Sequence, residues 1–180
     1  ISEPNTGKTC DPTKHRRLVN RPSIALQPVK ATQPSDPTME PLNGKTDLSR
    51  FNNSWYNHGP RWRLIAWFLV NAFLVNTYLP LPASIRIAIL RLFGAKIGMG
   101  VMIKPAVNIN YPWLLRVGNY VWIGEKVWID NLSEIVIGDN ACLSQGAMLL
   151  MGNHDYSRAT FDLSTRPIHL ADGVWIGAKS

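Results

Sequence analysis

Aliphatic residues recur every six positions through the second half of the chain. A helix repeats its apolar face every three to four residues and a strand every two, so neither produces this spacing. Short internal repeats of this kind indicate a solenoid of stacked strands, which we place at residues 96–180. The repeating positions form evenly spaced triplets until a longer interruption before Leu170: Ile97, Ile103, Ile109; Val117, Ile123, Ile129; Ile137, Leu143, Leu149; Leu170, Ile176.

Each six-residue unit has further preferences. We expect the aliphatic residue to point into a narrow triangular interior and the fifth residue to lie near a corner, with Gly or Asn in the strained turn conformations. Three units would make one coil, and the stack of coils would need a cap. The second position is often Gly (Gly98, Gly118, Gly124, Gly138, Gly177), and the fifth is often small or β-branched (Val101, Val107, Val121, Val127, Ala141, Ala147, Val174).

The chain before the repeats divides into two parts. Residues 1–50 are rich in Pro, Ser, Thr, Asn and Lys without a sustained apolar period, which predicts a disordered tail. This tail is either a linker or a segment that binds a partner. Because the chain starts at Ile1 without Met and stops at Ser180 within a repeat, we expect it to be a fragment.

Residues 51–95 predict a helical N-terminal cap. Two short helices fit the apolar runs 62–79 and 83–93, split by Pro80 and Pro82. The first run carries two asparagines and is shorter than the roughly 20 apolar residues of a membrane span. Its Trp and Arg residues leave two alternatives open for 61–93: packing on the domain or on a neighbouring subunit, and peripheral contact with a membrane.

Charge and cysteine content narrow the function classes. The net charge of +7 fits a nucleic acid, an anionic membrane or a phosphorylated small molecule. No zinc-finger spacing, phosphate loop or RNA-binding aromatic motif is present, so we expect no nucleic-acid partner. Cys10 and Cys142 form no disulfide pattern and no signal peptide is evident, which favours a cytoplasmic protein.

The repeat units carry a family resemblance. "IGMGVM", "IGEKVW", "IGDNAC" and "IGAKS" resemble the repeats of hexapeptide-repeat acyltransferases, and the likeness covers about residues 52–180. It implies a mainly β protein with a left-handed parallel β-helix. Within that class, "NNSWYNHGPRWRL", "VNINYPWLLRVGNYVWIGEKVWIDNL" and "GNHDY" are similar to colanic-acid-type exopolysaccharide acetyltransferases, relatives of the maltose and galactoside acetyltransferases.

The break in the repeat after Met151 marks the candidate active site. There "GNHDYSRATFDLSTRPIHL" leaves the solenoid and creates a concave edge that could enclose a ligand. His154 lies at this exit, and His titrates close enough to neutrality to remove a hydroxyl proton. In the resemblance, His154, at the family's spacing from Asn140, is the general base that moves an acetyl group from acetyl-CoA to a sugar hydroxyl. The other histidines we regard as structural or incidental: His15, His58 and His169.

Residues around the break are candidates for the acceptor site. Asp130 and Asn131 lie one coil earlier, and the resemblance implies that an Asn there binds the acceptor or stabilises the oxyanion. The alternative is that both residues only shape a turn. Asp155 or Tyr156 could orient the imidazole or contact the sugar, and Asp155 could equally be a loop residue without a catalytic part. Cys142 has no activating partner in the sequence, and we expect it to pack in the core.

The resemblance also suggests where the donor binds. The segment "VWIGA" matches a family segment that contacts the pantetheine arm of acetyl-CoA in a homotrimer, which points to Trp175, Gly177 and Ala178. No metal is expected, because a γ-carbonic-anhydrase-type solenoid would need several His ligands. Two alternatives stay open. One is an acyltransferase for another acceptor, such as an amino sugar or serine, and the other is a non-catalytic solenoid that acts as a binding or structural protein.

Overall fold

The computed structural model describes residues 46–180, so the predicted tail lies outside the described residues up to position 45. Its last residues form a short 3₁₀ helix, η1 (Leu48–Arg50). The backbone N–H of Asp47 donates to the carbonyl of Ala159, 2.8 Å away. The segment before the cap is thereby attached to the loop that follows the repeat break.

Two helices form the cap. α1 (Arg61–Val70) continues into a π-helical turn, η2 (Asn71–Val75), and α2 (Ala83–Leu92) follows the proline-rich connection. The helices expected on either side of Pro80 and Pro82 are therefore confirmed. Within residues 46–180, no helix has both the length and the apolar content to cross a membrane.

Buried polar contacts hold the cap on the strands. Trp67 is buried, and its indole N–H donates to the carbonyl of Ile109 at 2.9 Å. The Arg86 guanidinium, also buried, donates to the carbonyls of Leu79 and Leu81 at 2.8 and 2.6 Å, which pins the connection between the helices. The Trp67 bond joins α1 to the strands, and the Arg86 bonds join α2 to the proline-rich connection.

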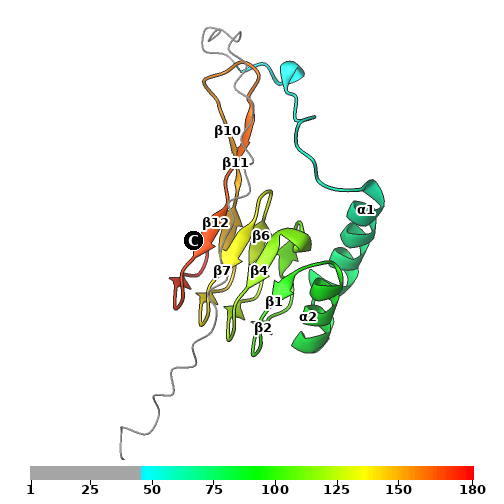
Figure 1. Ribbon diagram of the computed structural model, residues 1–180, viewed down its shortest axis with the longest axis vertical. Helices are drawn as coiled ribbons and strands as arrows, with labels where there is room; N and C mark the ends of the chain where they lie inside the picture. Colours follow the sequence, from blue (N-terminus) through cyan, green and yellow to red (C-terminus); the bar gives the residue numbers. More distant parts are fainter. Residues whose placement is uncertain (1–45) are drawn as a thin grey trace, which may run out of the picture.

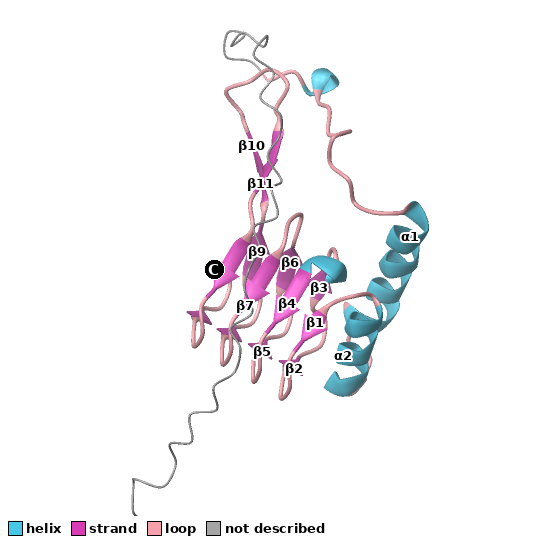
Figure 2. Cartoon of the chain, in the orientation of Figure 1, coloured by secondary structure: helices cyan, strands magenta, loops and turns pink. Residues whose placement is uncertain are grey.

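Apart from one hairpin, the strands beyond the cap lie in three parallel sheets (Figures 1 and 2). A 3₁₀ turn, η3 (Pro112–Leu114), precedes β4. The first sheet is β1 (Lys96–Ile97), β4 (Leu115–Val117), β7 (Ile135–Ile137) and β12 (Ile168–Leu170). The second is β2 (Met102–Ile103), β5 (Trp122–Ile123), β8 (Cys142–Leu143) and β13 (Trp175–Ile176). The third is β3 (Asn108–Ile109), β6 (Trp128–Asp130) and β9 (Met148–Leu150).

Successive strands visit the three sheets in turn, so the chain winds as a solenoid. Each strand pairs with the equivalent strand of the next coil, as in Ile97 with Val117 and Ile103 with Ile123. The expectation of a mainly β protein with parallel sheets is confirmed, and the strand order is consistent with a solenoid. The closed, left-handed β-helix stays a prediction.

The interior consists of the residues that the repeat singles out. Eight of the eleven repeat positions are buried, and Ile97, Leu170 and Ile176 are partly buried and packed against the core. Six of the seven fifth-position residues are buried as well. The six-residue period therefore identifies the inward-facing side chains correctly.

Gly or Asn was expected in the strained turn conformations, and this holds for half of them, with Ala, Tyr and Lys in the others. They fall on the fourth position of a unit, with φ near +60°: Gly100, Tyr120, Asn140, Gly173 at one corner and Ala106, Lys126, Gly146, Lys179 at the next. The second-position glycines instead allow neighbouring coils to approach. A Cβ at Gly118 would lie 2.8 Å from the backbone nitrogen of Asp139, closer than side chains pack.

Candidate active site

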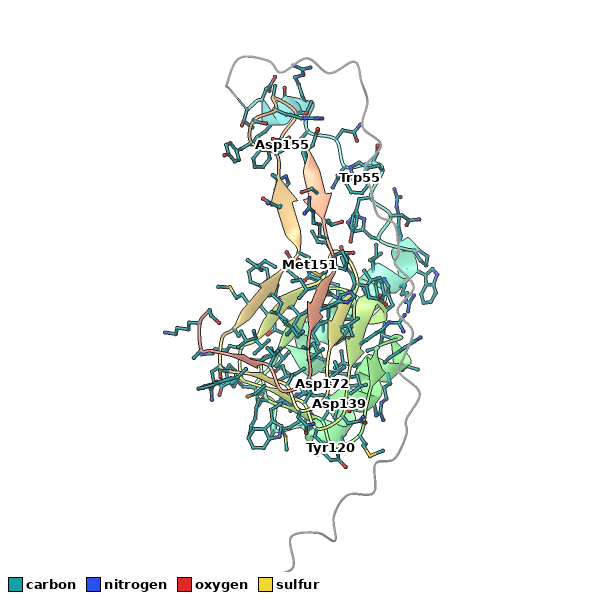
Figure 3. The ribbon with its side chains drawn as sticks, turned by 60° about the vertical axis from the view of Figure 1, so that its left-hand side comes forward. Trp55, Tyr120, Asp139, Met151, Asp155 and Asp172 are labelled. Atoms are coloured by element: carbon teal, nitrogen blue, oxygen red, sulfur yellow. The ribbon has the colours of Figure 1, made fainter. Side chains whose placement is uncertain are left out.

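A hairpin interrupts the solenoid after β9. It consists of β10 (Gly152–His154) and β11 (Leu163–Thr165), which pair antiparallel with His154 opposite Leu163. The regular spacing would place Asp155 beside Ile135, but Ile168 takes that place, so the hairpin is an insertion into the fourth coil. Figure 3 shows it projecting from the stack, with Met151 at its base and Asp155 at its far end.

His154 lies on one face of this hairpin between two phenylalanines. Its ring stacks on Phe161, with centroids 4.3 Å apart and planes 5° from parallel, and the ring of Phe51 is 5.7 Å away. Nδ1 lies 3.0 Å from the carbonyl oxygen of Phe161. Because a carbonyl only accepts, Nδ1 must carry the hydrogen, which leaves the Nε2 lone pair free to take a proton.

Phe161 supplies both the ring and the carbonyl that orient His154. Its φ of 49° lies in the left-handed region that bulky residues rarely adopt. Its N–H donates to the carbonyl of Arg158 at 3.1 Å, which closes the turn. The sequence analysis missed this residue, since a Phe in a loop carries no signal of a positive φ.

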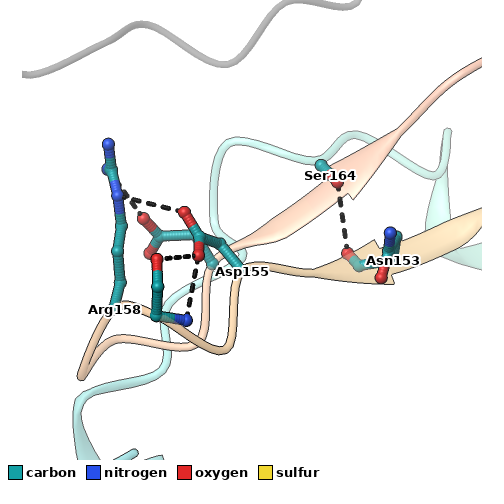
Figure 4. Close-up of polar contacts among 6 residues, drawn as sticks. Asn153, Asp155, Arg158 and Ser164 are labelled. Atoms are coloured by element: carbon teal, nitrogen blue, oxygen red, sulfur yellow. Dashed lines mark hydrogen bonds and ion pairs between the residues drawn. The ribbon is translucent and has the colours of Figure 1, made fainter. Parts of the chain in front are cut away.

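Asp155 stabilises the tip of the hairpin (Figure 4). Its carboxylate accepts from the N–H and hydroxyl of Ser157, and these bonds lower its pKa; it also forms an ion pair with Arg158 at 3.3 Å. No hydrogen bond joins Asp155 to the His154 ring in the part of the chain that the structure describes. Tyr156 is 81% exposed beside it and available to a ligand.

Asp130 and Asn131 lie at the base of the hairpin. The Asp130 carboxylate is half-buried and accepts from the Asn110 amide, and burial raises its pKa. Asn131 is fully buried, and its amide bonds both the N–H (2.9 Å) and the carbonyl (2.6 Å) of Tyr111. Asn131 therefore holds the preceding coil in place.

Asp130 and His154 are separated along the hairpin. The N–H of Met151 donates to the carbonyl of Asp130, and His154 follows three residues later in an extended strand. At about 3.3 Å per residue, the imidazole is about 10 Å further along, too far for direct contact with Asp130. An acceptor molecule could span this interval.

An aromatic cluster at the same base was not predicted. The Tyr56 hydroxyl donates to the carbonyl of Leu132, and burial raises its pKa. The ring of His58 lies 4.2 Å from that of Tyr56 and 5.6 Å from that of Tyr111. The only sequence signal is the density of aromatic and polar residues in "NNSWYNHGP".

The opposite face of the hairpin carries a polar groove. Neighbouring residues of a strand point to opposite faces, so Asn153 and Ser164 face away from the His154 side. With Arg166 they line a cavity of about 480 Å³ at the hairpin base. The groove offers uncharged donors and acceptors and one guanidinium.

The predicted donor residues lie elsewhere on the chain. Trp175 is 75% exposed on the outer face of the second sheet, and its indole N–H donates to the Ser144 hydroxyl at 2.7 Å. Gly177 and Ala178 follow it and are exposed. The hairpin leaves between the third and first sheets, so one chain does not bring His154 and Trp175 together. Among the described residues, no three His, Cys, Asp or Glu side chains gather as metal ligands do.

Two of the curated relatives that the chain matches are putative acetyltransferases by name. The chain is 43% identical over 91 residues to proteins named as the putative colanic acid biosynthesis acetyltransferase WcaF in Escherichia coli K12 and Shigella flexneri, covering 51% of this chain and 50% of each relative. The predicted resemblance is confirmed. Nodulation protein L of Rhizobium leguminosarum bv. viciae is 26% identical over 93 residues, 49% of this chain and 48% of that protein.

These relatives extend beyond the matched segment. The chain spans about half the length of the curated relatives it matches. No family model matches the chain, and no solved structure does. The acetyltransferase relationship thus rests on sequence identity, together with the parallel solenoid described above.

Proposed function

We propose that this protein is an acetyl-CoA-dependent O-acetyltransferase that acts on a sugar hydroxyl in exopolysaccharide synthesis. The observation that carries the proposal is the bond between His154 Nδ1 and the Phe161 carbonyl, which leaves Nε2 as a proton acceptor. The names of the relatives support the reaction class and the saccharide context.

His154 is the general base in this mechanism. The sugar hydroxyl oxygen attacks the thioester carbonyl carbon while Nε2 takes its proton. The carbon–sulfur bond then breaks, and the imidazolium returns the proton to the departing thiolate. The Phe161 carbonyl and ring keep the imidazole aligned throughout. In other enzymes a carboxylate orients the catalytic histidine in this way.

The acceptor binds between the hairpin and its base. Tyr156 and the half-buried carboxylate of Asp130 are suited to hydrogen bonds with sugar hydroxyls, and Asp155 shapes the tip that presents Tyr156. Asn131 contributes through Tyr111, whose backbone it holds. A direct bond from Asn131 to the acceptor requires its amide to be released from Tyr111.

The donor lies along the outer face of the second sheet, on Trp175, Gly177 and Ala178. An indole that is 75% exposed offers the apolar surface that a pantetheine arm needs. His154 and Trp175 are far apart in one chain. We therefore propose that the active site forms between copies in a homotrimer of left-handed β-helices. Exposed apolar side chains on the outer faces of the second and third sheets suit such contacts: Met102, Trp122, Trp128, Met148, Leu150.

Release of free thiol from acetyl-CoA with a panel of sugars tests this function. We expect His154→Ala to reduce turnover by about 10²- to 10⁴-fold, the usual loss when a general base is removed. His169→Ala is the matched control, since His169 is exposed on β12, and it should keep full activity.

Unchanged turnover in His154→Ala would refute the mechanism. Absence of sugar-dependent thiol release from the folded wild-type protein would refute the enzyme assignment. Serine and an amino sugar belong in the same panel, because preference for either would reassign the acceptor. Circular dichroism of each variant shows whether the fold is kept.

A further inference from the structure

The outer face of α1 is apolar and uncovered. While Trp67 packs on the strands, the opposite face exposes Trp62, Ile65, Phe68, Leu69 and Phe73, with the rings of Trp62 and Phe68 each 71% exposed. Figure 2 shows α1 and α2 along one side of the stack, with no helix or strand of the described chain outside them. Monomeric proteins rarely expose a continuous apolar face, so this face is a candidate binding surface.

The charge around this face has one sign. Between Asp47 and Glu125 the sequence contains no acidic residue, yet it contains eight basic ones: Arg50, Arg61, Arg63, Arg86, Arg91, Lys96, Lys104, Arg116. Within residues 46–180, the recorded ion pairs involve Arg116 and Arg158, so the basic residues of the helical cap form none. Within the cap, Arg86 is buried and Arg63 lies over the Trp113 ring, so the exposed cations are Arg61 and Arg91. No acidic residue of the cap compensates them.

This combination selects the kind of partner. A second copy of the chain meeting this face symmetrically would bring cations against cations, because a two-fold interface pairs a surface with itself. An anionic lipid surface complements both features, since aromatic side chains enter the headgroup region while Arg and Lys stay with the phosphates. The helical run from Arg61 to Val75 is too short to span, so it fits parallel to the surface.

We propose that the outer face of α1, with the exposed Arg61 at its start, binds the surface of a membrane that contains anionic lipids. Trp62, Phe68 and Phe73 insert between headgroups, and Arg61, exposed at the start of α1, contacts lipid phosphates. The hairpin with His154 lies at the other side of the molecule from α2 and stays free for its ligands (Figure 1).

Co-sedimentation with vesicles tests the proposal. The wild-type chain should bind vesicles of equal parts phosphatidylcholine and phosphatidylglycerol and bind phosphatidylcholine vesicles weakly, with binding reduced by salt. The double variant Phe68→Gln/Phe73→Gln should lower the partition coefficient at least about tenfold, because two apolar anchors are lost. Arg61→Glu should lower it as well. Leu48→Gln, which changes an apolar residue that is 66% exposed outside the cap, should bind like the wild type.

Two outcomes overturn the proposal. One is a folded wild-type chain that binds neither kind of vesicle, or binds both equally at all salt concentrations. The other is a double variant that binds as well as the wild type. If the double variant instead loses an oligomer seen for the wild type by sedimentation velocity, while neither binds lipid, the face is a subunit interface. Thiol release in solution does not depend on lipid, so the enzyme proposal is judged separately.

Discussion

His154 is oriented by a backbone carbonyl and two aromatic rings. A carbonyl cannot change its protonation state, so the tautomer of His154 is fixed at every pH at which the imidazole is neutral. The cost is the left-handed backbone of Phe161, which the turn from Arg158 enforces. Local backbone geometry therefore sets the orientation and the tautomer of the proposed base.

Asn131 gives a prediction at the residue scale. Asn131→Ala should lower the free energy of unfolding by about 1–3 kcal/mol, because the N–H and carbonyl of Tyr111 lose their buried partners. Urea denaturation followed by circular dichroism measures the change. Asn76→Ala, at an exposed asparagine of the cap connection, is the control and should change stability little. Equal stability of the two variants would show that Tyr111 does not depend on Asn131.

The sequence predicted residues whose role is set by the repeat. Ile103, Ile123 and Leu143 were expected inside because every third unit returns to the same wall, and all three are buried. The carbonyl partner of His154 was not predictable, since it depends on the path of a turn that ends at Phe161. The site could thus be located by the break in the repeat, while its internal contacts could not.

At the scale of the elements, close stacking of coils depends on glycine. The third residue of a unit reaches back to the previous coil: the Asp139 carboxylate accepts from the N–H of Asn119 at 2.7 Å, and Asp172 accepts from the N–H of Asp139 at 2.8 Å. A side chain at the second position of the previous coil, such as Gly118, would occupy the space of the Asp139 carboxylate. The sequence shows that glycine recurs at the second position. The structure shows that it is needed there for contact between coils and not for backbone strain.

Gly118 tests this account. Gly118→Ala should destabilise the protein by about 1–3 kcal/mol, because its methyl group would meet the backbone of Asp139. Asn76→Ala, at the exposed asparagine of the cap connection, is again the control and should leave the melting temperature almost unchanged. Thermal unfolding of both variants decides the matter, and a stable Gly118→Ala protein would contradict tight stacking.

At the scale of the whole molecule, the proposed active site needs residues from two copies. The hairpin with His154 leaves the stack between the third and first sheets, whereas Trp175 lies on the second. The exposed apolar side chains between these regions, such as Trp122 and Trp128, have no cover within the described chain. In the proposed arrangement, a single chain therefore holds the parts of the site without assembling it.

Mixing two inactive variants tests the shared site. His154→Ala and Trp175→Ala should each lose activity, and refolding or co-expressing them together should restore about a quarter of wild-type thiol release. That fraction follows because half of the copies supply an intact His154 and half an intact Trp175 at any interface. A mixture with no more activity than either variant alone would contradict the shared site. It would mean that His154 and Trp175 do not act together across an interface.

The hairpin leaves the repeat and the coils resume in register. Ile168 pairs with Ile135 as Ile135 pairs with Leu115, although a longer stretch of chain separates the first pair. The length and composition of the inserted segment are thus independent of the stacking that stabilises the rest. New acceptor preferences could be engineered by exchanging residues 152–165 as a cassette that keeps His154 and Phe161, with the solenoid serving as an unchanged scaffold.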